Sequence, residues 1–259
     1  MLFETHWFSC RVMNFSDPDK RRMHFMLQII PVIDIRGGIV VHARGGNRQN
    51  YPVLKSVLTP SAEPAEVISD LLAWLPFPCI YIADLDAIEQ RCQQESFYRE
   101  LCRQFPQTAF WLDSGIKRAH EVAAYDDISN LQLVVGSETL VETEMLMQAD
   151  SASRLILSLD KKKETNLGNG ELFSQPKWWT RKMILMNLDR VGADQGPDLQ
   201  WLRTLLSQSQ AVDWYLAGGI RNEADLIQAQ RTGAKGVLIA SALHTGALSK
   251  ASLKRLLKK

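Results

Sequence analysis

The apolar residues of this chain gather in short runs that return at intervals along residues 26–259. Within a run the residues are largely β-branched and do not alternate with polar ones, which is typical of a parallel strand covered on both faces. Eight runs predict strands at Ile29–Ile33, Ile80–Ala83, Ala109–Leu112, Leu133–Val135, Leu155–Leu159, Met183–Met186, Trp214–Ala217 and Gly236–Ala240.

Between the runs, apolar residues return every three or four positions, the period of a helix with one buried face. This pattern predicts helices at Pro64–Leu75, Ser96–Phe105, Ala119–Tyr125, Glu142–Ala149, Asp198–Ser207, Glu223–Thr232 and Leu248–Leu257. Regular alternation of strand and helix predicts an α/β fold of the (β/α)8 class, the TIM barrel, because right-handed crossovers close the pattern into a ring. A further apolar run, Ile39–Ala43, predicts an extra hairpin arm after the first strand.

The second half of the chain repeats fragments of the first. Leu112–Lys117 reads LDSGIK and returns as LAGGIR at Leu216–Arg221, while Val134–Ser137 returns at the same displacement as Leu238–Ser241. Two matches at one displacement predict a barrel built from two duplicated half-barrels.

With 259 residues and 46% hydrophobic content, the chain can bury a large core, and the repeat favours a single barrel over residues 26–259. Residues 1–25 have no periodicity, include the mixed-charge run Asp17–Arg22 and lack the features of a secretion signal. We therefore expect an appended, poorly ordered N-terminal tail. Because Met26 directly precedes the first strand, translation from Met26 and a functional arm are equal alternatives.

The 30 basic and 29 acidic residues leave a net charge of +1, so no overall field recruits nucleic acid or an anionic membrane. No apolar run approaches the roughly 20 residues that cross a bilayer. The cysteines Cys10, Cys79, Cys92 and Cys102 lack zinc-finger spacing, and no Cys, His and Asp cluster has metal-ligand spacing. We expect a cytoplasmic protein without metal or cofactor; no feature identifies a protein partner.

Polar and small residues stand at the ends of the predicted strands, which in a barrel open on one face where the active site is built. They are Asp34, Asp84, Asp86, Asp113, Gly115, Gly136, Ser137, Asp160, Asn187, Asp189, Gly218, Gly219, Ala240 and Ser241. So many carboxylates on one rim cost stability through repulsion, which favours a functional role for the set. For any single Asp, a helix cap or a loop ion pair is an equal alternative.

Small residues after the last two strands predict a phosphate site, because only small residues let backbone N–H groups approach an anion closely. This second-half phosphate site consists of Gly218, Gly219, Ala240 and Ser241. The corresponding first-half phosphate site consists of Gly115, Gly136 and Ser137. Together they predict a small-molecule ligand with a phosphate at each end, unless the glycines merely end strands tightly.

Five motifs in combination resemble the histidine-biosynthesis barrel family, which comprises ProFAR isomerase and the imidazole glycerol phosphate synthase cyclase. They are Ile30–Asp34, Asp84–Asp86, Gly196–Pro197, Ala217–Ile220 and Gly236–Ser241. The resemblance covers Leu27 to about Leu243 and implies a phosphoribosyl substrate. It also implies an Amadori-type aldose–ketose rearrangement, in which Asp34 matches the base and Asp160 the acid.

The loop after the sixth strand departs from this family. The isomerases carry two threonines and two aspartates where this chain has Met186, Asn187, Val191 and Ala193. Losing two hydroxyls and two carboxylates removes hydrogen bonds that would orient the standard substrate. The run Lys161–Lys163 after Asp160 is interpreted as a solvated loop.

The loop after the first strand is unusually basic. Arg44 and Arg48 predict a clamp for a phosphate or carboxylate, with Tyr51 stacked on a ring; a solvated hairpin is an equal alternative. His42 is interpreted as a packed histidine. The arm resembles that of divergent isomerase-like paralogues of methanogens and methylotrophs, which implies methanopterin-linked one-carbon metabolism.

Three functions are compatible with these features. The first is an isomerase of a phosphorylated aminosugar related to ProFAR, for which Arg44, Arg48, Asp84, Asn187 and Asp189 are the expected substrate-binding residues. The second is a divergent paralogue that uses the same carboxylates on another phosphorylated intermediate of cofactor or one-carbon metabolism. The third, a non-catalytic binder of a phosphorylated ligand, does not account for the retained pair of carboxylates.

Overall fold

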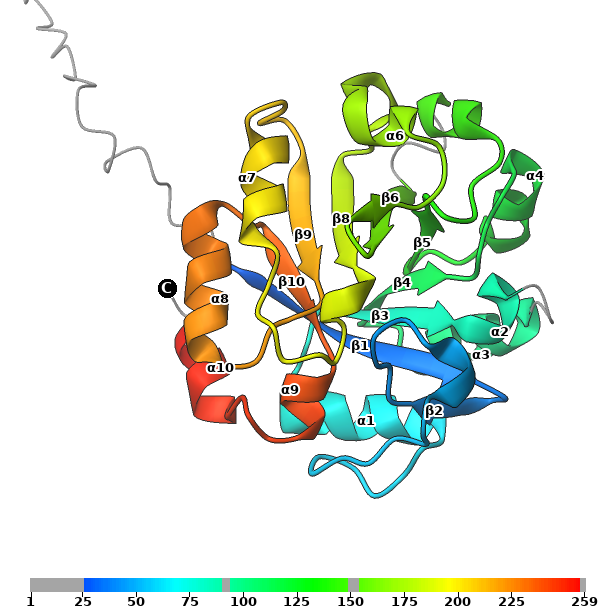
Figure 1. The fold of residues 1–259 in the computed structure, drawn as a ribbon. Helices are drawn as coiled ribbons and strands as arrows, with labels where there is room; N and C mark the ends of the chain where they lie inside the picture. The colour runs from blue at the N-terminus through cyan, green and yellow to red at the C-terminus, as the bar shows by residue number, and fades with distance from the viewer. Residues whose placement is uncertain (1–25, 90–93, 149–153, 257–259) are drawn as a thin grey trace, which may run out of the picture.

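Eight parallel strands form a closed barrel in the computed structural model, which describes residues 26–89, 94–148 and 154–256 (Figure 1). The barrel strands are β1 (Gln28–Arg36), β3 (Cys79–Asp84), β4 (Ala109–Asp113), β5 (Leu131–Gly136), β6 (Leu155–Lys162), β8 (Lys182–Asn187), β9 (Asp213–Ala217) and β10 (Gly236–Ile239). The ring closes where β10 pairs with β1 in parallel, from Gln28 opposite Gly236 to Pro31 opposite Ile239. The predicted fold class is confirmed, and the predicted tail lies outside the described residues.

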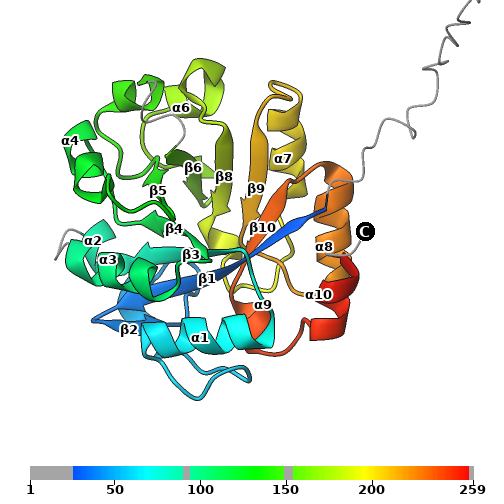
Figure 2. The same cartoon turned by 180° about the vertical axis from the view of Figure 1, so that it is seen from behind.

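The helices lie outside the ring of strands in both views (Figures 1 and 2). The α-helices are α1 (Pro64–Trp74), α2 (Leu85–Ile88), α3 (Glu95–Gln104), α4 (Ala119–Val122), α6 (Glu171–Ser174), α7 (Leu199–Leu206), α8 (Glu223–Thr232), α9 (Ser241–His244) and α10 (Lys250–Leu256). The 3-10 turns are η2 (Arg48–Asn50), η3 (Ala123–Tyr125), η4 (Thr143–Met147), η5 (Pro176–Trp178) and η6 (Leu188–Arg190).

Two predictions for helices need correction. The predicted helix Glu142–Ala149 contains only the 3-10 turn η4 among the described residues, and no α-helix was predicted between β6 and β8, where α6 lies. Both elements are about one turn long, too short for apolar periodicity to appear in the sequence. Regular helices such as α8, which Asn222 caps and Gly233 ends at φ 112°, match their predictions closely.

The core has two layers, as a strand without alternating polarity requires. One layer packs the outer faces of the strands against the helices, with Phe110, Leu157 and Leu226 fully buried. The other fills the barrel interior, where Trp111 and Tyr215 meet edge to face with ring centroids 4.8 Å apart. These side chains fill the middle of the barrel.

Two short strands extend the barrel at its carboxyl face. β2 (Ile39–Val41) pairs antiparallel with the end of β1, which confirms the predicted hairpin arm. β7 (Thr165–Asn166) pairs antiparallel with Lys161 and Lys162, which belong to β6. The interpretation of Lys161 as solvated is therefore wrong, because the strand continues through it and buries its side chain.

None of the helices in the described part of the chain is long and apolar enough to cross a membrane. The repeated fragments occupy matching places, since Gly115 follows β4 with φ 68° and Gly219 follows β9 with φ 87°. The half-barrel duplication itself stays a prediction.

Candidate active site

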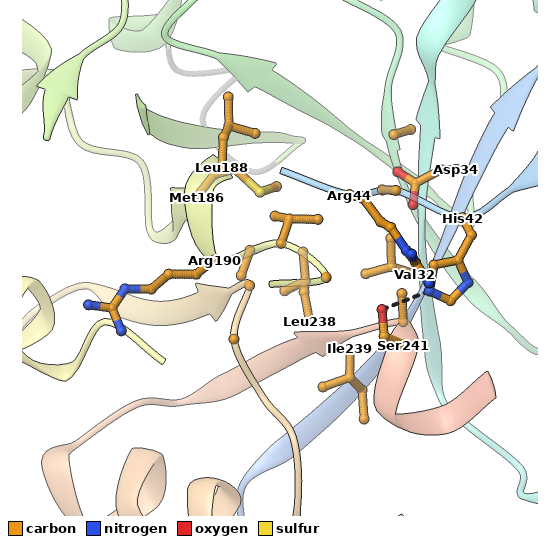
Figure 3. A pocket seen from close by; sticks show the side chains of 18 of the residues that line it. Val32, Asp34, His42, Arg44, Met186, Leu188, Arg190, Leu238, Ile239 and Ser241 are labelled. Atoms are coloured by element: carbon orange, nitrogen blue, oxygen red, sulfur yellow. Dashed lines mark hydrogen bonds between the residues drawn. The ribbon is translucent and has the colours of Figure 1, made fainter. Parts of the chain in front are cut away.

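A cavity of about 440 Å³ opens at the carboxyl ends of the barrel strands. Asp34 of β1 and Asp160 of β6 both line it, and these strands lie diametrically opposite in the ring. Figure 3 shows Asp34, Arg44 and His42 together, with Met186 and Leu188 across the pocket. The structure therefore brings the two predicted catalytic carboxylates to one cavity.

Asp34 is buried, with 9% of its surface exposed. Burial raises the pKa of its carboxyl to about 7, against a smaller opposing effect of the positive charge on Arg48. Its carboxylate accepts no hydrogen bond from any residue that the structure describes. A cavity-facing carboxyl with a pKa near neutrality can take up a proton and release it at physiological pH.

Asp160 is also buried, and three donors hold its carboxylate. Ser158 Oγ lies 2.6 Å from Oδ1, while Ser137 Oγ and the Glu138 N–H lie 3.2 and 3.4 Å from Oδ2. Burial raises the pKa of Asp160 to about 7, and the negative charge of Glu138 adds to the shift.

Lys161, the residue after Asp160, does not line the cavity. Its ammonium turns away and pairs with Asp198 at 2.7 Å, above the ring of Trp201 at 4.7 Å from the centroid. Successive side chains of a strand point to opposite faces, so Lys161 must lie outside the barrel when Asp160 lies inside.

Two further carboxylates, which the sequence analysis did not name as site residues, line the cavity. Asp113, at the end of β4, accepts a hydrogen bond from Tyr81 at 3.3 Å, and burial raises its pKa to about 6. Glu138 forms an ion pair with Arg48. Asp113 stood among the strand-end residues, whereas Glu138 had no signal because only folding brings it opposite the loop that carries Arg48.

The loop between β2 and α1 covers part of the cavity with Arg44, Arg48 and Tyr51. His42, interpreted from the sequence as a packed histidine, also lines the cavity, and its Nε2 lies 3.0 Å from Ser241 Oγ. Burial and the neighbouring charge of Arg44 lower the pKa of His42. A neutral imidazole therefore joins this loop to the second-half phosphate site.

All members of the second-half phosphate site line the cavity. Gly218 and Gly219 have φ values of 91° and 87°, in the left-handed region that favours glycine. A Cβ on Gly219 would lie 2.1 Å from the carbonyl oxygen of Gly196, so glycine is required for this close approach. The N–H groups of Gly218, Gly219, Ser241 and Ala242 donate no hydrogen bond to the described residues.

The first-half phosphate site lies apart from the cavity lining, since Gly115, Gly136 and Ser137 are not among the lining residues. Ser137 is fully buried, and a Cβ on Gly168 would lie 1.7 Å from its carbonyl oxygen. A role for these three residues in phosphate binding stays a prediction, and their surroundings differ from those of the second-half site.

Three predicted substrate-binding residues also lie off the cavity lining. Asp84 accepts the Ala87 N–H at 2.9 Å and caps α2. Asn187 donates to Asp198 at 2.8 Å, and Asp189 accepts the N–H of Lys163. Their contacts in this structure are local, and their substrate-binding role stays a prediction.

The departures in the loop after β8 change the chemistry of the cavity wall. Met186 and Val191 line it with apolar side chains. Among the described residues, no group of three or more His, Cys, Asp or Glu side chains is arranged to hold a metal ion.

The model of a protein family described as "Histidine biosynthesis protein" matches residues 28–249 of the chain. An uncharacterized protein of Methanocaldococcus jannaschii is 30% identical over 226 residues, which are 86% of this chain and 95% of that protein.

Two similar proteins are named 1-(5-phosphoribosyl)-5-((5-phosphoribosylamino)methylideneamino)imidazole-4-carboxamide isomerase, which is ProFAR isomerase. That of Elusimicrobium minutum is 23% identical over 237 residues, 83% of this chain and 94% of the relative. That of Streptococcus sanguinis is 21% identical over 244 residues, 88% of this chain and 97% of the relative.

Proposed function

The chain belongs to the histidine biosynthesis protein family, and from this premise we propose that it is an acid–base isomerase of a phosphorylated amino sugar. The observation that carries the proposal is the pair of buried carboxyls, Asp34 and Asp160, on opposite walls of one cavity. The second-half phosphate site at the edge of the same cavity would anchor the substrate.

In the proposed reaction Asp160 protonates the ring oxygen of an aldosylamine as the C1–O bond breaks, which leaves a protonated Schiff base at C1. Asp34 then removes the C2 proton, and the C–H electron pair forms the C1–C2 double bond of an enolamine. Asp34 returns the proton to C1 while the C2 hydroxyl loses its proton to Asp160, which forms the C2 carbonyl of the aminoketose and restores both carboxyls to their starting states. Asp34 and Asp160 line opposite sides of the cavity, which supports this order of steps, because a sugar bound there would have one carboxyl on each side.

The charges around the two carboxyls support this assignment. Arg48 acts on Asp34 and favours its ionised form, as a base needs, while Glu138 and Asp113 act on Asp160 and favour its protonated form, as an acid needs. Two groups of similar pKa can thus hold different protonation states before the reaction starts.

The test uses the aldosylamine that forms from ribose 5-phosphate and ammonia, followed by proton NMR in deuterium oxide. The protein should accelerate the loss of the C2 proton signal and the appearance of a ketose. Asp34→Asn and Asp160→Asn should each lower the rate by about two to four orders of magnitude. The control Asp194→Asn removes a carboxylate from the exposed rim of the same cavity and should keep the rate. A rate within tenfold of the wild type in either test variant contradicts the assigned role.

The apolar wall formed by Met186 and Val191 favours a second candidate, a divergent paralogue that acts on another phosphorylated intermediate of cofactor or one-carbon metabolism. Expression of the gene in a histidine auxotroph that lacks ProFAR isomerase separates the two. Growth without histidine identifies ProFAR as a substrate, and failure with well-folded protein favours the second candidate. A protein that binds sugar phosphates but leaves the C2 proton in place is a non-catalytic binder.

A further inference from the structure

The two ends of the cavity differ in the state of their backbone N–H groups. At the second-half phosphate site, no described residue accepts the N–H groups of Gly218, Gly219, Ser241 and Ala242. Three of the four corresponding N–H groups at the first-half site are already used: Gly115 donates to Asp113 at 3.0 Å, Ser137 to the Ser158 carbonyl at 2.8 Å and Glu138 to Asp160 at 3.4 Å. Among the described residues, the second-half site thus leaves four N–H groups without an acceptor, and the first-half site leaves that of Ser114.

The space above Gly136, where a second phosphate would be expected, lies between carboxylates. An atom at the Cβ position of Gly136 would be 3.1 Å from Asp160 Oδ2 and 3.9 Å from Asp113 Oδ2. A phosphate at this place would face two carboxylate oxygens, which costs free energy through repulsion and desolvation.

The charge balance at this end is acidic. Four carboxyl groups line the cavity, and Arg48 pairs with only one of them. Asp113, Glu138 and Asp160 come from β4, the loop after β5 and β6, which lie side by side, and Asp34 lies on the opposite wall. The Asp34 carboxylate is nine-tenths buried and accepts no hydrogen bond from the described residues, although it faces the cavity (Figure 3). A buried carboxylate without a donor is expected to receive one from the ligand.

We infer that the substrate carries a single phosphate, held at the second-half phosphate site, and presents an amine or another nitrogen donor to the carboxylates around Asp113 at the opposite end. This inference rests on the proposed function and narrows its substrate class. It excludes a bisphosphorylated substrate such as ProFAR itself, whose name contains two phosphoribosyl groups.

Titration calorimetry on the full chain measures the binding affinity of two matched pairs of probes. Glucosamine 6-phosphate and glucose 6-phosphate differ only in an amine, and fructose 1,6-bisphosphate and fructose 6-phosphate differ only in a second phosphate. The amine should tighten binding by about tenfold, as expected for one charge-assisted hydrogen bond to a carboxylate. The second phosphate should not tighten it.

Variants of the cavity residues test which carboxylates give the preference for the amine sugar. Asp113→Asn and Glu138→Gln should each reduce the preference for the amine, taken as the ratio of the two affinities measured on the same variant, to within about threefold. The matched control Asp194→Asn keeps the preference, because that carboxylate lies on the exposed loop beyond β8. Two variants are used so that a folding defect in one does not decide the result.

The outcomes separate the inference from the proposed function. A bisphosphate that binds at least tenfold tighter than its monophosphate overturns the inference, as does equal binding of the amine and hydroxyl sugars, while the phosphosugar assignment stands. If none of the four probes nor inorganic phosphate binds, the proposed function fails and the inference fails with it.

Discussion

Asp34 and Asp160 are acidic side chains in surroundings that disfavour their charge. Both were expected on a polar rim, yet both are buried, and burial is the main cause of a pKa near 7 for each. In the folded state each carboxyl keeps a proton between about pH 4 and about pH 7, where the unfolded chain has lost it. The native state therefore loses stability as pH rises through this range, at about 1.4 kcal/mol for each unit of pKa difference.

Asp34→Asn should remove this penalty. We expect the variant to be more stable than the wild type at pH 8, by about 1–3 kcal/mol in the free energy of unfolding, and nearly equal to it at pH 4. Urea denaturation at the two pH values measures this, with the exposed Asp194→Asn as control. A variant that loses more than about 1 kcal/mol at pH 8 would indicate that the carboxylate is structural.

At the scale of elements, a buried ion pair joins β6 to α7. Lys161 and Asp198 are 2.7 Å apart and both less than 10% exposed, and Asn187 donates to the same carboxylate. Burial alone would raise the pKa of Asp198, but hydrogen bonds from Lys161 and Asn187 outweigh it and lower the pKa. Through Asn187, these contacts hold the end of β8, which carries Met186, and the start of the loop that carries Val191 into the cavity wall.

Asp198→Asn should destabilise the fold by about 2–4 kcal/mol, because it leaves the Lys161 ammonium with only the exposed carboxylate of Glu164, at 3.2 Å, in place of its buried partner. Since the folded pKa of Asp198 is lowered, its contribution is present above the ordinary carboxyl pKa and is lost as pH falls through the folded value. The difference between wild type and variant should therefore shrink toward acidic pH. Asp213→Asn, which removes only the exposed pair with Arg181, should change stability by less than about 1 kcal/mol; equal losses for the two variants would argue against the buried network.

A second contact between elements connects the loop after β2 to α9. The bond between His42 and Ser241 spans most of the sequence, and Gly45 donates to the Val191 carbonyl at 2.8 Å. The loop that brings Arg44 and Arg48 over the cavity is thus anchored to the residues expected to hold phosphate.

His42→Ala should weaken the binding of inorganic phosphate by about three- to tenfold, because Ser241 Oγ loses the partner that orients it. Calorimetric titration of the variant measures the effect. His120→Ala, on the exposed surface of α4, serves as the control and should bind as the wild type does. Unchanged binding in His42→Ala would show that Ser241 does not depend on this contact.

At the scale of the whole molecule, the described barrel strands form a closed ring with a cavity at their carboxyl ends, so a ligand bound there should stabilise the barrel. Every barrel strand pairs with two neighbours, and β1 closes the ring against β10. Binding to the native state alone adds RT ln(1 + [L]/Kd) to the free energy of unfolding.

Millimolar ribose 5-phosphate should therefore raise the melting temperature, with about 2.7 kcal/mol expected at roughly a hundredfold excess over Kd. Thermal melts followed by circular dichroism measure the shift, and ribose at the same concentration controls for the sugar. A melting temperature that stays constant up to the solubility limit would contradict phosphate binding at the open face.

The sequence by itself determined the barrel and the location of its site. Apolar runs without alternation specify parallel strands buried on both faces, and the strand ends then mark the open face, so Asp34, Asp160 and the second-half phosphate site could be named. These features are local, and each can be interpreted from a few adjacent residues.

Only the tertiary structure decided which of these residues share a cavity and what charge they carry there. The burial that raises the pKa of Asp34, the ion pair of Glu138 with Arg48 and the internal use of the first-half N–H groups arise between segments far apart in the chain. The one-turn helices were missed because they are shorter than the period that reveals a helix. Asymmetry between two similar half-barrels is likewise invisible in their shared motifs, because it depends on which carboxylates and loops folding brings against each phosphate site.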